Sequence, residues 1–389
     1  MKKNEKIGLF LEDSRISGVS IYTKDLAEYI NENLDLKCEI VLPKKNSNHF
    51  RKQLVKKKIS YKFYEIERIS KNTVIDYIKF FFVKKKKLFN FLKKNPYRIY
   101  IIQGSLQFLN IFTLNCLKKN YILIIHDAYT NFLFKFFLRF LVKKNTKIIF
   151  VSKRSKIFYN EVFKENKKKI IPTGSINVKR IRNRVKRKYF KIGTICNINP
   201  DKNIIFLLNV AKIFKNENLN VIFEIAGNIY KSQKNYYLFL NKFVSKYQLN
   251  NVKFLGYTEN TNKFLNSLDL YCCFSKNESS PISVWEAMHV GLPIVSTDIG
   301  DLKYHIFRGK FGYLVSNNKL LKFVYKIKKI LNNKHLYTKF SNAAFNYSRK
   351  NFNRDDNFKK LLSFILSNKN EIDIKKIKLS TGNLNRGNP

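Results

Sequence analysis

The sequence has 389 residues, of which 44% are hydrophobic and 15% aromatic, and its formal net charge is +49. This length predicts two or three domains, and the apolar content excludes both a mostly disordered chain and a single small binding module. The charge is uneven, because residues 51–200 hold 38 basic and 6 acidic residues, a net +32, whereas residues 201–300 hold 10 and 8, a net +2. One region of the chain is therefore expected to face an anionic surface.

The first half of the chain alternates short apolar runs with longer amphipathic stretches. Strands are predicted at residues 6–10, 38–43, 98–103, 121–126 and 147–151. Helices are predicted between them, at residues 21–33, 73–94, 105–119, 130–144 and 152–164. This alternation is typical of βαβ units in a parallel sheet.

The second half repeats this alternation and predicts a second doubly wound sheet. Its strands are expected at residues 190–196, 221–227, 252–256, 269–274 and 292–297. The basic segment 177–188 is typical of a linker, and the sequence loses its periodicity after residue 373. We therefore expect an α/β protein with an N-terminal domain at 1–185, a C-terminal domain at 186–350, a helical segment at 351–373 and a disordered tail at 374–389.

The sequence predicts a cytoplasmic protein without a membrane-spanning segment. The N-terminal apolar run soon reaches Glu12 and Asp13, which favours a first strand over a signal peptide. The apolar stretch 131–142 is interrupted by Lys135 and Arg139 and is too short to span a bilayer. No CxxC spacing occurs, so we expect reduced core thiols at Cys38, Cys116, Cys196, Cys272 and Cys273.

The segment 269–301 carries the most informative pattern, in which seven residues separate Glu278 from Glu286. Ser280 before Pro281 predicts a helix start whose free amides, over residues 281–284, suit a diphosphate. A nucleotide sugar across this start can meet Glu278 with its sugar and Glu286 with its ribose. The spacing alone leaves an alternative open, in which Ser283 and Glu286 form an S-x-x-E capping box and Glu278 is a solvated loop residue.

The surrounding residues resemble glycosyltransferase family 4, a set of retaining enzymes also called glycosyl transferases group 1. The motif of that family combines a strand ending in Ser, an E-x7-E pair and an EAM-x-x-G-x-P segment. It is matched here by Ser275, Glu278, Glu286, Ala287, Met288, Gly291, Pro293, Ile294, Val295, Ser296 and Gly300. The resemblance implies the GT-B fold, two facing Rossmann-like domains with a cleft between them, and it assigns Glu278 to the donor sugar and Glu286 to the ribose.

Further positions of the family pattern lie upstream, within residues 192–214. Lys202 occupies the position of a lysine that holds the donor diphosphate in the family. The arginine position reads Asn197, which removes one fixed positive charge from the leaving group. In the interdomain turn 171–178, Thr173 stands where asparagine is common in the family.

Two features of the N-terminal half also match the family. Gly18, in the loop 14–20, can bring backbone close to a phosphate, although a single glycine is also typical of an ordinary turn. His126 and Asp127 end a predicted strand where the family often has a His-Asp pair beside the donor sugar. The alternative for His126 is a hydrogen-bonded core histidine.

The resemblance implies a retaining transfer of a sugar from a nucleotide-sugar donor to a glycan or lipid-linked acceptor, in surface polysaccharide or glycolipid synthesis. The expected catalytic residues are Lys202, Glu278 and His126. The expected donor-binding residues are Gly18, Asn197, Lys202, Glu278, Ser280, Pro281, Ile282, Ser283 and Glu286. No cofactor is expected, since the nucleotide sugar is a substrate, and no metal is expected, since no D-x-D motif precedes residue 300.

The basic N-terminal domain predicts a peripheral contact with an anionic membrane surface. Phe132, Phe134, Phe136, Phe137 and Phe140 lie beside Lys135, Arg139, Lys143 and Lys144, which is typical of an interfacial helix or, equally, of a core helix. Two other functions compete. A nucleotide-sugar epimerase shares the architecture, whereas a nucleic-acid-binding protein is disfavoured because the basic runs lack a helix-turn-helix, zinc or RNP pattern.

Overall fold

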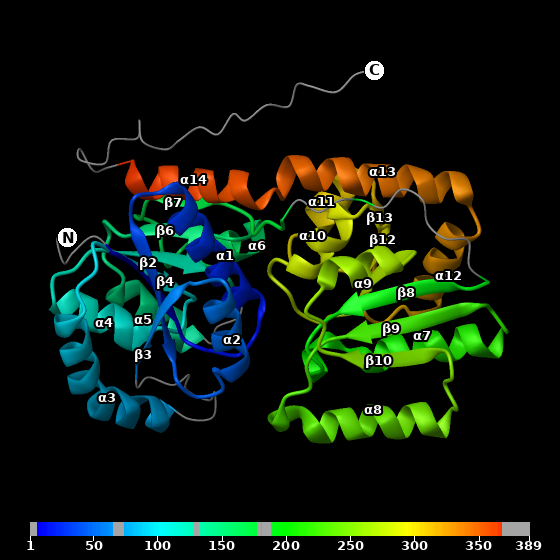
Figure 1. Cartoon of the computed structure of the whole chain (residues 1–389), viewed down its shortest axis with the longest axis horizontal. Helices are drawn as coiled ribbons and strands as arrows, with labels where there is room; N and C mark the ends of the chain where they lie inside the picture. Colours follow the sequence, from blue (N-terminus) through cyan, green and yellow to red (C-terminus); the bar gives the residue numbers. More distant parts are fainter. Residues whose placement is uncertain (1–5, 65–73, 128–131, 177–179, 181–187, 368–389) are drawn as a thin grey trace, which may run out of the picture.

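The computed structural model describes residues 6–64, 74–127, 132–176, 180 and 188–367, which form two α/β domains lying side by side (Figure 1). The first domain has a seven-stranded parallel sheet in the order β3-β2-β1-β4-β5-β6-β7. Its strands are β1 (Lys6–Leu11), β2 (Lys37–Pro43), β3 (Ser60–Tyr64), β4 (Ile99–Gln103), β5 (Tyr121–Ile125), β6 (Lys147–Phe150) and β7 (Lys168–Ile170).

Helices cover both faces of the first sheet. They are α1 (Gly18–Asn33), α2 (Asn48–Lys56), α3 (Val74–Lys94), α4 (Phe108–Cys116), α5 (Phe132–Leu141) and α6 (Lys153–Phe158). Successive residues of β1 point to opposite faces, so Leu9 joins one buried core and Phe10 the other. Burial on both faces explains why the central strands are continuous apolar runs.

The second domain has a six-stranded parallel sheet in the order β10-β9-β8-β11-β12-β13. Its strands are β8 (Phe190–Ile195), β9 (Val221–Ala226), β10 (Val252–Gly256), β11 (Leu270–Cys273), β12 (Ile294–Thr297) and β13 (Gly312–Val315). Its helices are α7 (Ile204–Asn216), α8 (Lys234–Lys246), α9 (Thr261–Ser267), α10 (Ile282–His289), α11 (Leu302–Gly309), α12 (Leu320–Leu331) and α13 (Lys334–Asn351). The two predicted doubly wound sheets are therefore confirmed.

The chain crosses between the domains twice, at neighbouring points. The amide of Ser175 donates to the carbonyl of Phe352 at 2.9 Å, and the amide of Arg354 donates to the carbonyl of Ser175 at 3.1 Å. After this crossing, α14 (Arg354–Leu366) lies along the first domain, in line with α13 (Figure 1), and buries Phe358 and Leu361 in that domain's core. The predicted linker residues 177–179 and 181–187 and the predicted tail lie outside the described residues.

The sequence predicted core thiols at all five cysteines and no membrane-spanning segment. All five cysteines are free thiols; Cys38, Cys272 and Cys273 are buried, and Cys196 is half-buried. The expectation of a core thiol is wrong for Cys116, because this residue lies exposed on the last turn of α4. Of the helices that the structure describes, none has both the length and the apolar content needed to cross a bilayer.

Candidate functional site

The predicted site residues gather where the carboxyl ends of the two sheets face each other. In a doubly wound sheet, ligands bind where the strand order reverses, which is between β1 and β4 in the first sheet and between β8 and β11 in the second. Gly18 begins the helix after β1, Asn197 and Lys202 follow β8, and Glu278 follows β11. The topology therefore brings the sequence-predicted residues of both domains to one cleft.

Lys202 and Glu278 form an ion pair at this cleft. Lys202 ends a 3-10 turn, Pro200–Lys202, whose cap is the Asn199 side chain. The hydroxyl of Ser275 also donates to Glu278, at 3.2 Å between Oγ and Oε1. Burial disfavours the ammonium charge, but the adjacent carboxylate outweighs it and raises the pKa of Lys202 above the ordinary lysine value. The pair thus keeps a fixed positive charge beside an oriented carboxylate.

Helix α10 begins at Ile282 without any side-chain cap. Its N-cap residue is Pro281, and Glu286 is the fifth residue of the helix, so the capping-box alternative is wrong. The Ser280 hydroxyl instead accepts a hydrogen bond from Trp285 at 3.1 Å and contacts Thr173. The first-turn amides of Ile282 and Ser283 have no acceptor within the helix, which makes this start suitable for an anion.

The glycine of the family motif shapes the loop in front of this helix. Gly300 has a φ of +51°, and a Cβ atom there would lie 2.6 Å from the carbonyl oxygen of Ser279. Only glycine therefore lets the segment after β12 pack against the Glu278–Ser279 backbone. The Ser283 side chain faces the hydroxyl of Tyr271 on β11, which anchors the first turn of α10 to the sheet.

Asn197, at the family's arginine position, holds the opposite domain. Its side-chain amide donates to the carbonyl of Ile16 at 3.0 Å, and the Tyr230 hydroxyl donates to the same oxygen at 2.8 Å. These bonds place the loop after β1 over the second domain. A Cβ atom on Gly18 would lie 3.4 Å from Cδ1 of Ile282, so the starts of α1 and α10 meet across the cleft. Asn197 therefore links the two domains by a hydrogen bond, whereas an arginine at this position would supply a positive charge.

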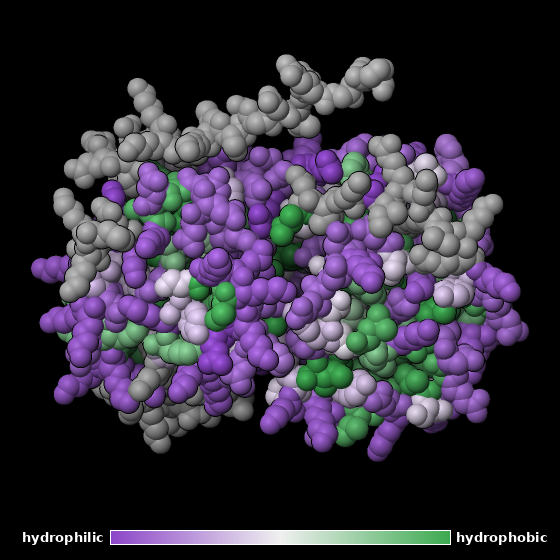
Figure 2. Space-filling view, viewed as in Figure 1, coloured by the Kyte–Doolittle hydropathy of each residue, from purple (hydrophilic) through white to green (hydrophobic). Residues whose placement is uncertain are grey.

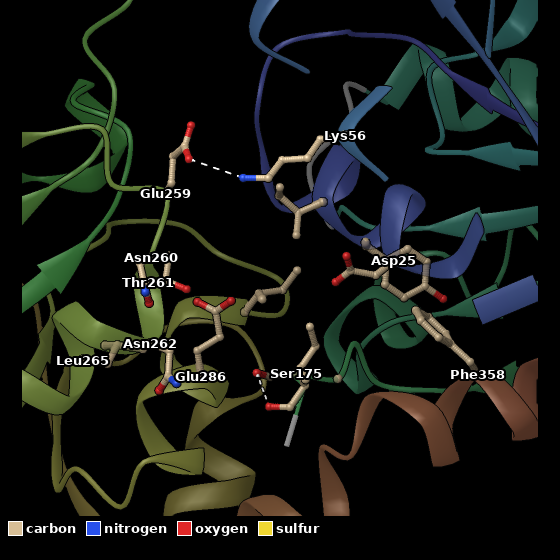
Figure 3. A pocket seen from close by; sticks show the side chains of 15 residues that line it. Asp25, Lys56, Ser175, Glu259, Asn260, Thr261, Asn262, Leu265, Glu286 and Phe358 are labelled. Carbon is tan, nitrogen blue, oxygen red and sulfur yellow. Dashed lines mark hydrogen bonds and ion pairs between the residues drawn. The ribbon is translucent and has the colours of Figure 1, made fainter. Parts of the chain in front are cut away.

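A cavity of 410 Å³ opens beside these two helix starts. On the face shown in Figure 2, hydrophilic residues cover most of both domains, and the boundary between them is hollowed. Figure 3 shows Glu286 pointing into the cavity from α10 and Asp25 facing it from α1. Residues 259–262, at the start of α9, line a third side, and Lys56 pairs with Glu259 across the rim at 3.8 Å. The cavity thus has walls from both domains.

Glu286 is a carboxylate in the wall of the cavity. Among the residues that the structure describes, none forms a hydrogen bond or ion pair with it. Burial and the nearby charge of Asp25 raise the pKa of Glu286 to about 7. The sequence pattern did not lead us to Asp25. This acid lies three residues after Tyr22 and four before Tyr29, and this helical spacing, which places it on the buried face of α1, is the signal that could have identified it.

His126 contacts residues of the first domain, including Tyr22 of the cavity wall. Its Nε2 atom is 2.7 Å from Oε1 of Gln103, and its ring meets that of Tyr22 at 5.0 Å between centroids. Burial lowers the pKa of His126 to about 3, so the ring is neutral at pH 7. Within the described residues, no hydrogen bond or ion pair joins His126 to Lys202 or Glu278. Its catalytic role stays a prediction.

Contacts on two sides bring the domains together. Asp301 of the second domain accepts hydrogen bonds from the backbone amides of Lys153 and Arg154, which begin α6 of the first. On the other side, Gln53 of α2 donates to the Tyr257 hydroxyl at 2.6 Å. Over the described part of the chain, no group of three or more His, Cys, Asp or Glu side chains is arranged to hold a metal ion.

Comparisons with known proteins agree with this architecture. Residues 175–347 match the family model "Glycosyl transferases group 1". A poly(ribitol-phosphate) alpha-N-acetylglucosaminyltransferase of Staphylococcus aureus is 30% identical over 158 residues, 39% of this chain and 30% of that protein. An uncharacterized glycosyltransferase of Haemophilus influenzae is 26% identical over 204 residues, 51% of this chain and 55% of that protein. The matched regions thus span about a third and about half of these relatives.

Solved glycosyltransferase structures share the fold of nearly the whole chain. Anabaena HepE in complex with UDP and glucose superimposes with a TM-score of 0.76 at 14% identity, over 94% of this chain and 100% of that one. Staphylococcus aureus TarM, in a complex that includes UDP, gives a TM-score of 0.72 at 16% identity, over 92% and 99%. Residues 175–347 are therefore similar to the group 1 glycosyltransferases, and nearly the whole chain has the GT-B fold of these solved structures.

Proposed function

We propose that this protein moves a sugar from a nucleotide-sugar donor to a glycan or lipid-linked acceptor, with retention of the anomeric configuration, in the synthesis of a surface polysaccharide or glycolipid. The observation that carries the proposal is the Glu286 carboxylate, which has no hydrogen-bond or ion-pair partner among the described residues and lines a cavity at the start of α10. The Lys202–Glu278 pair follows the strand ends of the same domain. The HepE structure holds UDP and glucose, which supports a nucleotide-sugar donor. The Staphylococcus aureus relative is named as an acetylglucosaminyltransferase, which supports a glycan acceptor.

The site residues divide the donor between them. Glu286 accepts hydrogen bonds from the ribose, and the diphosphate lies on the first-turn amides of α10 and on Lys202. Glu278 then exchanges its bond to Lys202 for the donor sugar. As the glycosidic bond breaks, negative charge grows on the departing diphosphate, and Lys202 stabilises that charge without an added metal or cofactor. The acceptor enters from the first domain, and the leaving phosphate takes its proton on the same face.

A transfer assay tests this proposal. Labelled nucleotide sugars are incubated with and without lipid and glycan acceptors, and the anomeric configuration of the product is determined by NMR. We expect a product only when acceptor is present, with the donor's configuration retained. An epimerised nucleotide sugar formed without acceptor would favour the epimerase alternative, and an inverted product would contradict the retaining mechanism.

The first domain is also proposed to rest on an anionic membrane surface through α5. Leu138 of this helix is fully buried, whereas Phe136, Phe137 and Phe140 are 52%, 51% and 72% exposed. A purely core helix does not leave three aromatic rings in water, so the exposed face favours the interfacial alternative. Arg139 extends from the same exposed turns and adds attraction for lipid phosphate. A membrane contact there suits a lipid-linked acceptor.

A further inference from the structure

Asp25 is an acid on the buried side of a helix. It lies on α1 with its side chain only 14% exposed, and its ion-pair partner is the adjacent Lys24, at 3.2 Å. It lines the cavity on the side of the first domain, opposite Glu286, and both carboxylates are directed at the same space (Figure 3). The cavity therefore places one acid from each domain around a single volume.

Two carboxylates that share a buried cavity oppose each other's ionisation. Burial raises the pKa of Asp25 despite Lys24, as it raises that of Glu286. A ligand that donates a hydrogen bond to each acid lowers the free-energy cost of ionising both, because a buried carboxylate is stable when its oxygens are hydrogen-bonded. A phosphate cannot do this, since it is an anion without protons to spare at neutral pH. A vicinal diol can, because it carries two adjacent hydroxyl donors.

Residues 259–262, at the start of α9, supply the rest of a nucleoside-sized enclosure. Asn260 caps α9, and Thr261 and Asn262 line the cavity with short polar side chains. The apolar wall comes from Ile21, Leu265 and Ile282. Such a mixture of apolar walls and a few directed polar groups is typical of small-molecule sites.

We propose that Asp25 is a second donor-binding carboxylate, so that the 2′- and 3′-hydroxyl groups of the nucleotide ribose bridge Asp25 and Glu286 and the site selects ribonucleotides over deoxyribonucleotides. This inference rests on the proposed function and adds to it a contact from the first domain. Because the ribose then touches both domains, nucleotide binding also favours their closed arrangement. A site built to bond a hydroxyl group rejects the analogue that lacks it, since its polar group is left unpaired.

The test measures the affinities of the full chain for UDP, ADP and GDP, and for the 2′-deoxy and 3′-deoxy forms of each, by calorimetry. For the wild type we expect the ribonucleotide to bind about tenfold more tightly than either deoxy form. In Asp25→Ala, that discrimination should disappear for one of the two deoxy forms, because the hydroxyl that Asp25 held no longer has a partner. Asp25→Asn keeps the shape of the side chain and a hydrogen-bond acceptor, so it should retain part of the discrimination between ribonucleotide and deoxy forms.

Asp35→Asn is the matched control, since Asp35 is an exposed acid near the end of the same helix. It should leave all ratios unchanged, and unfolding temperatures establish that each variant is folded. Unchanged discrimination in both Asp25 variants would overturn the inference while leaving the proposed function intact. If the wild type binds none of the three nucleotides, the proposed function itself fails, and the inference falls with it.

Discussion

In the proposed mechanism, Lys202 and Glu278 are the residues on which the chemistry of the site depends most directly. Each is charged, and each has the other as its partner while no donor is bound. In the proposed mechanism, the ion pair holds both side chains at the cleft until the diphosphate and the sugar replace it. Preorganised charge of this kind is worth more in a partly buried cleft than in water.

Replacing either Lys202 or Glu286 by alanine should abolish most of the sugar transfer. For Lys202→Ala and for Glu286→Ala we expect losses of about 2 to 4 kcal/mol in transition-state stabilisation, or roughly 30-fold to 1,000-fold in turnover. Both side chains face the cleft, so the unfolding temperature should change little. Lys276→Ala is the matched control, because Lys276 is an exposed lysine two residues before Glu278. Near-normal turnover in both site variants would remove the proposed site.

The pH dependence of nucleotide binding should report on Glu286. Because the ribose donates hydrogen bonds to an ionised carboxylate, affinity should increase as pH rises through about 7, where Glu286 loses its proton. The folding stability of the protein without nucleotide should instead decrease as pH rises. A carboxyl whose folded pKa is raised stabilises the fold at low pH, and this contribution is lost as pH rises from the ordinary value of 4.5 to about 7.

Two variants isolate this titration. Glu286→Gln should bind with an affinity that is nearly flat between pH 6 and 8, because the amide does not titrate. Asp25→Asn removes the neighbouring negative charge, so the midpoint for Glu286 should move to lower pH. Calorimetry measures the nucleotide affinity at each pH. A wild-type affinity profile without a midpoint near pH 7 would contradict the assignment of Glu286 to the ribose.

The sequence predicted the residues of the local motif, and it missed those that depend on tertiary placement. Glu278, Glu286 and Lys202 belong to short patterns whose spacing is fixed by strand ends and one helix. The bond from Asn197 to Ile16 joins residues that are distant in the chain and belong to different domains, so no local pattern indicates it. Asp25 is a single acid in an amphipathic helix, and its proposed role depends on the second domain facing it.

At the scale of elements, the strands that the sequence missed are all edge strands. Among the described strands, β3, β7 and β13 end their sheets, so each pairs there with one neighbour. Edge strands are short and bear polar residues, as in SYKFY of β3 and KKI of β7, so they lack the continuous apolar run that marked the central strands. Helix α2 was missed for a similar reason, since only Phe50 and Leu54 of its nine residues are buried.

Helix α5 should determine binding to anionic membranes. We expect Phe136→Ser and Phe140→Ser, combined, to weaken co-sedimentation with phosphatidylglycerol vesicles severalfold, because exposed aromatic rings supply the apolar part of an interfacial contact. Binding should also weaken with salt, since lysine and arginine attract lipid phosphate over about 10 Å at 0.1 M salt.

Phe307→Ser provides the control for α5. Phe307 is 84% exposed but lies on α11 of the second domain, so its loss should leave vesicle binding unchanged. Equal binding of the wild type to neutral and anionic vesicles would contradict the membrane proposal. Tighter, salt-sensitive binding to RNA or DNA would instead revive the nucleic-acid alternative.

For the whole molecule, the decisive feature is that both domains contribute to one cleft. The starts of α1 and α10 meet there, and α14 returns from the second domain to complete the core of the first. Asp301 and Asn197 each tie one domain to backbone groups of the other. The arrangement supplies positive potential from two helix starts as well as from Lys202.

We therefore expect transfer to survive chelation. A diphosphate leaving group needs positive charge from protein donors or from a divalent ion, and here Lys202 and the helix amides are assigned to it. Addition of EDTA to the transfer assay should reduce the rate by no more than about twofold. If chelation stops the reaction and magnesium or manganese restores it, the assignment of the leaving group is wrong, and Glu278 becomes a candidate metal ligand.

The most direct test of the central claim is the thermal shift of the wild type and of Glu286→Ala across a panel of nucleotide sugars. A donor at 100 times its dissociation constant stabilises the folded state by about 2.7 kcal/mol, which raises the unfolding temperature by several degrees. We predict that at least one nucleotide sugar produces this shift in the wild type and that Glu286→Ala abolishes most of it. A wild type that no nucleotide sugar stabilises, or a variant that is stabilised equally, would contradict the claim that this cleft is the donor site of a glycosyltransferase.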